Sequence, residues 1–441
     1  MPLDPSILQN IRIAVADLNG QARAKRVPAV QYEKLLRGEA KMPLSALNLD
    51  IWGNDIADSP LLFETGDADG FLRPTERGLV PMPWIGPEAA MLPMWMYHAD
   101  GRPFEGDPRH ALADIKAQLD ALGLRAVTAT ELEFYLIDDT GEAFLPPRSP
   151  VSGRRAMGSA TLSMRMLDEF NAFFDALFEG CEAMGIDADT ATSEAGPGQF
   201  EVNLHHGDDV LKQADDTWLF KILVRRLARA HGMAASFMAK PYAGASGNGL
   251  HLHASLLDAE GRNVLDNGGP EGSEMLRHAI GGVLAAMPDS ALIFAPHANS
   301  YARLVPHAHA PTGVSWAYEN RTASVRVPVG PPKARRLEHR TAGGDVNPYL
   351  LMSAVLGAML IGIEDQITPP DPISGDAYAL DLPQIPATWE EAVERFERSD
   401  HMARIFTPEL IDNMIRTKRQ EMAGLAGLSE QQVLELYLEA V

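Results

Sequence analysis

Short segments in which apolar and polar residues alternate recur along the chain, and this period of two predicts strands. The five clearest segments each gather charged residues on one face and apolar residues on the other. They are Glu131–Leu136, Gln199–Leu204, Leu250–Leu256, Ser324–Val327 and Arg336–Arg340. Helices are predicted from about Asp107 to Leu122 and at 164–184, 216–233, 273–287, 348–364, 408–423 and 429–439. The mixture predicts an α+β fold.

The first hundred residues follow a different pattern. Ile11–Leu18 is typical of a strand, and the Asn19-Gly20 turn with the basic stretch that follows it, up to Pro28, predicts a β-hairpin. From there to about Pro103 the chain is rich in Pro, Gly and Asp and has only short apolar pieces. We therefore expect a small β-rich domain at residues 1–103 and a larger domain at residues 104–441.

Composition narrows the class of protein. Of 441 residues, 46% are hydrophobic and 22% are charged, as in ordinary globular chains. The formal net charge of −22 argues against a nucleic-acid partner or an anionic membrane surface. The single cysteine, Cys181, excludes an intramolecular disulfide. No secretory signal is visible and the longest apolar stretch, Tyr349–Ile363, is too short to span a membrane, so we expect a soluble cytoplasmic protein.

The polar faces of the predicted strands hold Glu, His and Arg but no lysine. Glu131 and Glu133 share one face, and carboxylates so close repel each other unless a cation lies between them. Oxygen-rich sites with an occasional imidazole suit Mg²⁺ or Mn²⁺. The alternative is that the segments are solvated outer faces of amphipathic sheets. We expect two or three ions, with the candidate ligands Glu131, Glu133, Glu194, Glu201, His251 and Glu338.

A cluster of cations stands out in this acidic chain. Its members lie within 20 residues of one another and are Arg321, Arg326, Lys333, Arg335, Arg336 and Arg340. Metal ions beside guanidinium groups are typical of phosphoryl-transfer sites, because both neutralise charge on the transferred group. A surface ladder of salt bridges is the alternative. Neither a Walker A motif nor a Gly-x-Gly-x-x-Gly after a strand is present, so nucleotide binding would use another fold.

These residues stand in ordered motifs that run over most of the chain. The motifs are Glu131-Leu-Glu133-Phe, Ser193-Glu194-Ala-Gly-Pro-Gly-Gln-Phe-Glu201, Gly247-Asn-Gly-Leu-His251-Leu-His253-Ala-Ser255, Asn299-Ser-Tyr-Ala-Arg303-Leu-Val-Pro306, Asn320-Arg321-Thr-Ala-Ser-Val-Arg326, Lys333-Ala-Arg-Arg336-Leu-Glu338-His-Arg340 and Asn347-Pro348-Tyr349. Together they make the chain resemble the type I glutamine synthetase family. The resemblance implies a small N-terminal β-grasp domain and a larger catalytic domain whose strands form an open antiparallel barrel surrounded by helices. It also implies a homododecamer of two stacked hexameric rings, with active sites between neighbouring subunits.

The resemblance also implies roles for individual residues. A first metal would be held by Glu133, Glu194 and Glu201, and a second by Glu131, His251 and Glu338. ATP would be contacted by His253, Ser255, Arg326, Lys333 and Arg336. Glutamate would be cradled by Gly247, Arg303 and Arg340, and the transferred phosphoryl group stabilised by Arg321. The implied reaction activates the γ-carboxylate of glutamate with ATP, and an amine then displaces phosphate from the acyl phosphate.

Two positions depart from the ammonia-using members of that family. Their loop carries a glutamate three residues beyond the proline of Arg303-Leu-Val-Pro306, and His309 stands there in this chain. Asp50 matches their ammonium-binding aspartate, but it stands in Leu-Asp50-Ile-Trp-Gly. A neutral imidazole lacks the pull of a carboxylate on ammonium, although it can act as a base near neutral pH. We therefore expect a γ-glutamyl–amine ligase.

Three alternatives stay open at this stage. A true glutamine synthetase would use ammonia, and a catalytically silent homologue would have a structural or regulatory role. A ligase that joins an acid other than glutamate is the third alternative. The sequence does not name the amine, because loops and a neighbouring subunit would shape its pocket.

Overall fold

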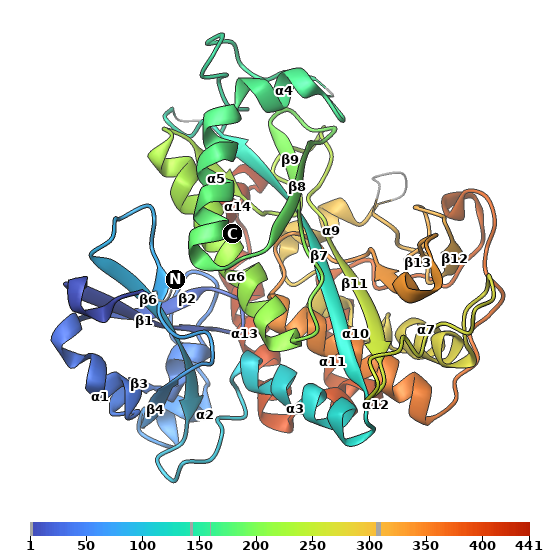
Figure 1. Cartoon of the computed structure of the whole chain (residues 1–441), viewed down its shortest axis with the longest axis horizontal. Helices are drawn as coiled ribbons and strands as arrows, with labels where there is room; N and C mark the ends of the chain where they lie inside the picture. The colour runs from blue at the N-terminus through green and yellow to red at the C-terminus, as the bar shows by residue number, and fades with distance from the viewer. Residues whose placement is uncertain (1–2, 142–143, 159, 306–309) are drawn as a thin grey trace.

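The computed structural model describes residues 3–141, 144–158, 160–305 and 310–441. A sheet formed by the first hundred residues lies at one side of the molecule, and a larger sheet with most of the helices makes up the rest (Figure 1). The expected α+β architecture is therefore confirmed.

The N-terminal sheet has six strands in the order β2-β1-β6-β4-β3, with β5 paired to β6. They are β1 (Asn10–Ala16), β2 (Ala22–Pro28), β3 (Ala40–Pro43), β4 (Asp69–Pro74), β5 (Val80–Pro81) and β6 (Ala89–Tyr97), with the short helices α1 (Tyr32–Leu36) and α2 (Pro60–Phe63). β1 and β2 form the expected hairpin, and Gly20 takes a left-handed φ of 75° in its turn. β1 pairs in parallel with β6 in the middle of the sheet. The β-grasp assignment stays a prediction.

One face of this sheet has a hydrophobic core of its own, and the other joins the main core. Apolar residues between Leu8 and Phe104 make up the separate core. Ala14, Leu18 and Ile51 instead belong to the cluster that fills the larger part of the chain. The local core includes Phe104, and the domain division at residues 103 and 104 stays a prediction.

The larger sheet has eight strands in the order β12-β13-β14-β11-β7-β9-β8, with β10 paired to β7. They are β7 (Arg125–Ile137), β8 (Ala188–Ser193), β9 (Gln199–Leu204), β10 (Ala234–Ser236), β11 (Leu250–Leu257), β12 (Trp316–Tyr318), β13 (Val325–Val327) and β14 (Leu337–His339). All five alternating segments fall on strands of this sheet. Its pairs are antiparallel except β12 with β13.

The helices follow the sequence pattern with three differences. They are α3 (Pro108–Ala121), α4 (Met164–Glu169), α5 (Asn171–Met184), α6 (Val210–Ala230), α7 (Glu274–Ala286), α8 (Ala291–Phe294), α9 (Ala298–Arg303), α10 (Pro348–Glu364), α11 (Trp389–Arg398), α12 (Asp400–Ile405), α13 (Pro408–Leu425) and α14 (Glu430–Ala440). The expected helix at 164–184 breaks at Phe170, and α6 begins six residues early because Asp209 caps it. Helices α8, α9, α11 and α12 were not expected.

The most apolar helix, α10, is buried along nearly its whole length. This explains the apolar stretch at Tyr349–Ile363 as a core helix. Among the described residues, no helix is both long and apolar enough to cross a membrane.

Helices α7 and α10 approach each other so closely that glycine is required at their contact. A Cβ atom at Gly362 would lie 2.1 Å from the carbonyl oxygen of His278, and one at Gly282 would lie 2.1 Å from that of Ala358. Both obstacles are backbone atoms, which cannot turn away as a flexible side chain would. A methyl group at either position therefore forces the two helices apart.

We expect Gly362→Ala to destabilise the fold by about 1–3 kcal/mol, the usual cost of overpacking a core. Chemical denaturation followed by circular dichroism measures the change. Gly244→Ala is the matched control, because a Cβ atom at Gly244 meets nothing within 4 Å. Equal stability of the two variants would contradict the packing argument.

Candidate active site

Four neighbouring strands bring the predicted metal ligands together. The register pairs Glu131 of β7 with His251 of β11, and Glu133 of β7 with Glu201 of β9. On the other side of β11, His253 is paired with Glu338 of β14. Because side chains alternate between the two faces of a strand, these paired residues share one face of the sheet. Their apolar neighbours Leu132, Phe134 and Leu252 are fully buried in the core on the opposite face.

The centre of the cluster is the carboxylate of Glu131. Its Oε2 lies 2.9 Å from Nδ1 of His251, and its Oε1 lies 2.9 Å from Nε2 of His253. Nδ1 of His251 also lies 3.8 Å from Oε1 of Glu338. Two sets of potential ligand atoms lie within 4.8 Å of one another, namely Glu131, Glu201 and His251, and Glu131, His253 and Glu338.

These sets contain predicted ligands but group them differently from the sequence-based expectation. Glu201 joins Glu131 and His251, and His253, which we expected to contact the nucleotide, joins Glu131 and Glu338. The chemical character of the donors is as expected, with carboxylate oxygens and a few imidazoles. The assignment of each ligand to a particular ion stays a prediction.

Two of the proposed metal ligands, Glu201 and Glu194, have carboxylates with raised pKa values. Burial, reinforced by the charges of Glu131 and Glu133, raises the pKa of Glu201 to about 9. Burial and the neighbouring Glu133 raise the pKa of Glu194 to about 7, although the charge of Arg321 opposes this shift. A bound cation would stabilise the charged form of these two carboxylates most, because burial and their neighbours disfavour that form. The donor set and its charge therefore fit a divalent metal ion.

Glu131 and Glu338 behave differently because histidine side chains face Glu131 and arginines face Glu338. Burial alone would raise the pKa of Glu131, but hydrogen bonds from His251 and His253 outweigh it and hold that pKa far below its usual range. Glu338 is fully buried between Arg326, whose Nη1 lies 2.8 Å from its Oε2, and Arg340, which bonds its Oε1. Against the cost of burial, the charge of Arg340 lowers the pKa of Glu338.

The remaining arginines and the lysine lie around this centre in different settings. Arg336 donates from Nε to Nδ1 of His253 over 3.1 Å, and Arg335 lies 3.6 Å from Asp266. Arg321 and Lys333 are exposed. Arg326 and Arg340 are ion-paired, but both pairs converge on the buried Glu338, so they do not form the surface ladder of salt bridges that was the alternative. The hydroxyl group of Ser255 donates to the carbonyl oxygen of Arg335 over 3.0 Å.

A tight backbone turn separates Glu133 from Arg303. The amide of Gly249 donates to Oε2 of Glu133 over 2.7 Å. Nη1 of Arg303 donates to the carbonyl oxygen of Thr341 over 2.7 Å, and the side chain is buried. A Cβ atom at Gly247 would lie 2.8 Å from Cγ of Arg303, so glycine is needed for this close approach. The structure thus brings Gly247 and Arg303 together, and their role as a glutamate cradle stays a prediction.

Sequence reasoning missed Gln199. Its Nε2 donates to the carbonyl oxygen of Gly247 over 2.9 Å and to Oε2 of Glu133 over 3.4 Å, so it joins the turn to the metal cluster. The signal was available, because Gln199 stands two residues before Glu201 and hence on the same face of β9. The side chain also donates to Oδ1 of Asn248 over 3.0 Å.

Two predicted catalytic residues are not placed in this cluster. Asp50 lies in the loop after a short 3₁₀ helix (Leu44–Leu47), where its carboxylate accepts the amide of Asn54 over 2.8 Å and Nε2 of Gln420 over 3.2 Å. These contacts attach Asp50 to its own loop and to α13. His309 lies outside the described residues.

Comparisons with known proteins agree with this geometry. A model of the family "glutamine synthetase, catalytic domain" matches residues 105–437. Over 434 residues the chain is 36% identical to a γ-glutamylputrescine synthetase of Escherichia coli K12, covering 98% of this chain and 92% of that protein. It is 31% identical over 445 residues to a glutamate–isopropylamine ligase of a Pseudomonas species, covering 98% and 96%.

A solved structure supports the same relationship. The structure titled "GmaS/ADP complex" matches with a TM-score of 0.85 and 29% identity over 97% of this chain and 98% of the other. The open sheet from β12 to β8 and its helices therefore form the mixed α+β fold of that group. Since the family model covers most of the chain and these relatives match along nearly all of it, the chain belongs to the glutamine synthetase family of carbon–nitrogen ligases.

Proposed function

We propose that the protein is an ATP-dependent ligase that forms a γ-glutamyl amide from glutamate and a small amine. The observation that carries the proposal is the half-buried cluster around Glu131, with carboxylates and imidazoles beside the arginines that flank Glu338. This combination suits the transfer of a phosphoryl group to a carboxylate. Two relatives that match nearly the whole chain are named for joining an amine to glutamate.

Two or three Mg²⁺ or Mn²⁺ ions would bind in this cluster. Their proposed ligands are Glu131, Glu133, Glu194, Glu201, His251 and Glu338. Raised pKa values at Glu194 and Glu201 support the proposal, because these carboxylates repel one another unless positive charge is present. When bound, such ions neutralise charge on the phosphate oxygens of ATP.

The chain's own residues would bind and orient the two substrates. The proposed nucleotide contacts are His253, Ser255, Arg326, Lys333 and Arg336, and the proposed glutamate contacts are Gly247, Arg303 and Arg340. Arg303 is buried beside the Gly247–Gly249 turn, so a substrate carboxylate reaching it would be shielded from water. Exposed Arg321 would close over the transferred phosphoryl group.

The chemistry follows from the poor reactivity of a carboxylate. An oxygen of the γ-carboxylate bonds to the γ-phosphorus of ATP, and the bond from that phosphorus to ADP breaks. The amine nitrogen then bonds to the acyl carbon, and phosphate leaves with the electrons of the carbon–oxygen bond. The amine must lose its proton before or during this attack, so a base is required near the acyl phosphate.

We infer that the site is completed by a neighbouring subunit in a dodecamer of two hexameric rings. Within one chain, the carboxylate of Asp50 is bonded to Asn54 and to Gln420 of α13 rather than to residues of the cluster on β7, β9 and β11. A neighbouring subunit that presents its Asp50 would supply the carboxylate that attracts the protonated amine. This arrangement supports the proposed assembly, in which each site uses two chains.

The proposal is tested by a phosphate-release screen with ATP, Mg²⁺ and glutamate against a panel of amines. We expect turnover with an alkylamine or polyamine that exceeds turnover with ammonia. Release with ammonia as the best acceptor would make the protein a glutamine synthetase instead. Absence of glutamate-dependent release with every amine would favour the silent homologue.

We expect Glu201→Ala to abolish turnover while the protein stays folded. The half-buried Glu201 carboxylate is repelled by Glu131 and Glu133, so its removal deletes a proposed metal ligand without weakening the fold. Isothermal titration with Mn²⁺ and the melting temperature test the two parts. Glu260→Ala is the control, because Glu260 is an exposed acid that pairs with Arg262. Full activity of Glu201→Ala at ordinary Mg²⁺ concentration would refute the metal assignment.

Amine preference is expected to depend on His309. A neutral imidazole supplies no charge for ammonium, whereas a larger amine gains about 0.8 kcal/mol for each CH₂ group it buries. Such an amine still arrives protonated, and an imidazole with an ordinary pKa near 6.5 can accept the proton. His309→Glu should shift the ratio of kcat/KM values toward ammonia, and His309→Ala should slow both reactions. If His309→Glu leaves the ratio unchanged, the residue does not select the amine.

A further inference from the structure

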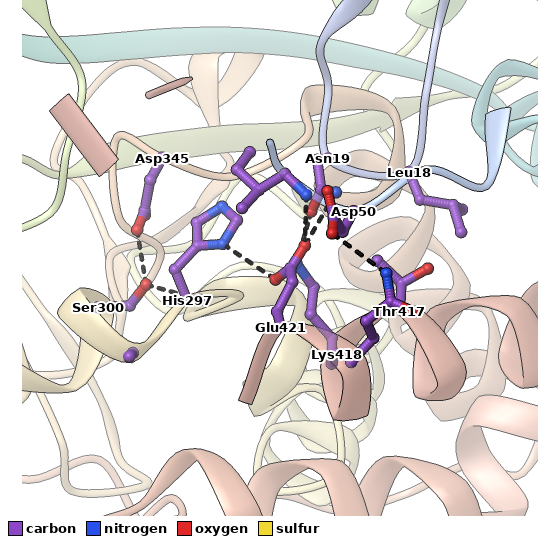
Figure 2. A network of polar contacts seen from close by, with 12 residues as sticks. Leu18, Asn19, Asp50, His297, Ser300, Asp345, Thr417, Lys418 and Glu421 are labelled. Carbon is purple, nitrogen blue, oxygen red and sulfur yellow. Dashed lines mark hydrogen bonds and ion pairs between the residues drawn. The ribbon is translucent and has the colours of Figure 1, made fainter. Parts of the chain in front are cut away.

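A buried network of polar side chains joins α13 to the turn at Asn19, to the Asp50 loop and to the start of α9 (Figure 2). Its centre is a pair on α13, Lys418 and Glu421, whose side chains are both fully buried. Nζ of Lys418 lies 2.9 Å from Oε2 of Glu421 and 2.5 Å from Oδ1 of Asn19, in the turn between β1 and β2. Nδ2 of Asn19 in turn donates to Oε1 of Glu421 over 3.2 Å.

The network fixes the loop that carries Asp50. Oε1 of Glu421 accepts the amide of Ile51, the residue after Asp50, over 2.8 Å. One turn earlier on α13, Oγ1 of Thr417 accepts Nδ2 of Asn48 over 2.8 Å. Since Gln420 bonds Asp50 itself, residues 417–421 hold the loop before, at and after Asp50.

The opposite side of the same carboxylate faces the helix that ends at Arg303. Oε2 of Glu421 lies 3.7 Å from Nδ1 of His297, a buried residue directly before α9. The amide of His297 donates to Ser300, whose hydroxyl group donates to Oδ2 of Asp345 over 2.6 Å. α9 spans only Ala298–Arg303, so a shift of His297 at its start would also shift Arg303 at its end. The side chain of Arg303 lies against Gly247, so that contact would change as well.

Stability alone does not account for this arrangement. Taking two charges out of water is costly, and apolar side chains of similar volume often replace a buried ion pair without loss of stability. Apolar replacements would not reproduce the hydrogen bonds that the Glu421 carboxylate accepts from Asn19 and Ile51. They would also remove the contact between that carboxylate and His297. A network of this kind specifies the relative position of the segments it joins.

We propose that Glu421 is a positioning residue that fixes the Asp50 loop and the Arg303 helix relative to each other. The inference rests on the proposed function, in which Asp50 attracts the amine and Arg303 binds glutamate. If Asp50 serves the site of a neighbouring subunit, Glu421 joins the glutamate cradle of one site to the amine site of the next. The proposed nucleotide contacts Arg326 and Arg336 bond instead to Glu338 and His253 on the sheet.

The test uses the full-length protein and two variants. Glu421→Gln keeps the shape of the side chain but removes its charge. The double variant Lys418→Met/Glu421→Leu removes both charges and keeps an apolar filling, so it guards against a loss of folding caused by an unpaired buried lysine. Asp215→Asn is the matched control, because Asp215 forms an equally buried ion pair with Arg109 at 2.9 Å and touches neither segment.

The first measurement is hydrogen–deuterium exchange, which needs no substrate. We expect exchange to rise about ten-fold in residues 47–55 and 295–304 of both Glu421 variants, and to stay at the wild-type level there in Asp215→Asn. Wild-type exchange in either segment of a folded Glu421 variant overturns the proposal. This outcome does not depend on which amine the enzyme uses, or on whether it uses one.

The second measurement is steady-state kinetics with the best amine. We expect KM for glutamate and KM for the amine to rise about five-fold or more in both Glu421 variants, with KM for ATP within about two-fold of wild type. If Glu421 had a merely structural role, its variants would change the KM values for glutamate, amine and ATP together or leave all three unchanged. One of these two patterns is expected for Asp215→Asn. Raised exchange with unchanged KM values would also refute the positioning role. Inactive wild-type enzyme would refute the proposed function. The exchange result would then decide by itself whether Glu421 fixes the Asp50 loop and the Arg303 helix relative to each other.

Discussion

Like charges directly opposite each other on the β7–β9 ladder are the constraint on which the rest of the site depends. Glu133 and Glu201 are a cross-strand pair, a position at which two carboxylates destabilise a sheet. The sheet tolerates them because the other face of β7 carries Leu132, Phe134 and Leu136, all fully buried in the main core. Apolar burial thus holds the strands in a register that the carboxylates alone would oppose.

Much of this site could be predicted from the sequence because it is local to strands. A period of two identifies the face on which Glu131, Glu133 and Glu201 lie, and the structure confirms that they share it. The pattern does not contain the pairing of strands distant in sequence. The pattern therefore could not show that His253 lies close enough to Glu131 and Glu338 for the three to bind one metal ion. It also could not show that Gln199 bonds to both Glu133 and Gly247.

The helices show the same limit of local reasoning. α10 was evident from its long apolar stretch, whereas α11 is short and rich in charge and was missed. The early start of α6 at Val210 depends on its cap, Asp209, rather than on the hydrophobic period. The break at Phe170 has no side-chain cap and no signal in the hydrophobic period. The long-range network was invisible for a stronger reason. Asn19 and Lys418 are separated by 399 residues, and the turn signal at Asn19-Gly20 says nothing about a partner on a distant helix.

Buried charge therefore serves two different ends in this fold. At Glu338 two arginines compensate one carboxylate, and the balance keeps a charged centre beside the proposed phosphate site. At Glu421 one lysine compensates one carboxylate. The same carboxylate also accepts hydrogen bonds from Asn19 and Ile51 of the N-terminal part. The first arrangement stays polar because chemistry requires charge there. The second has no such requirement, so the directed bonds that link the two parts of the chain are the physical reason for burying charge at that junction.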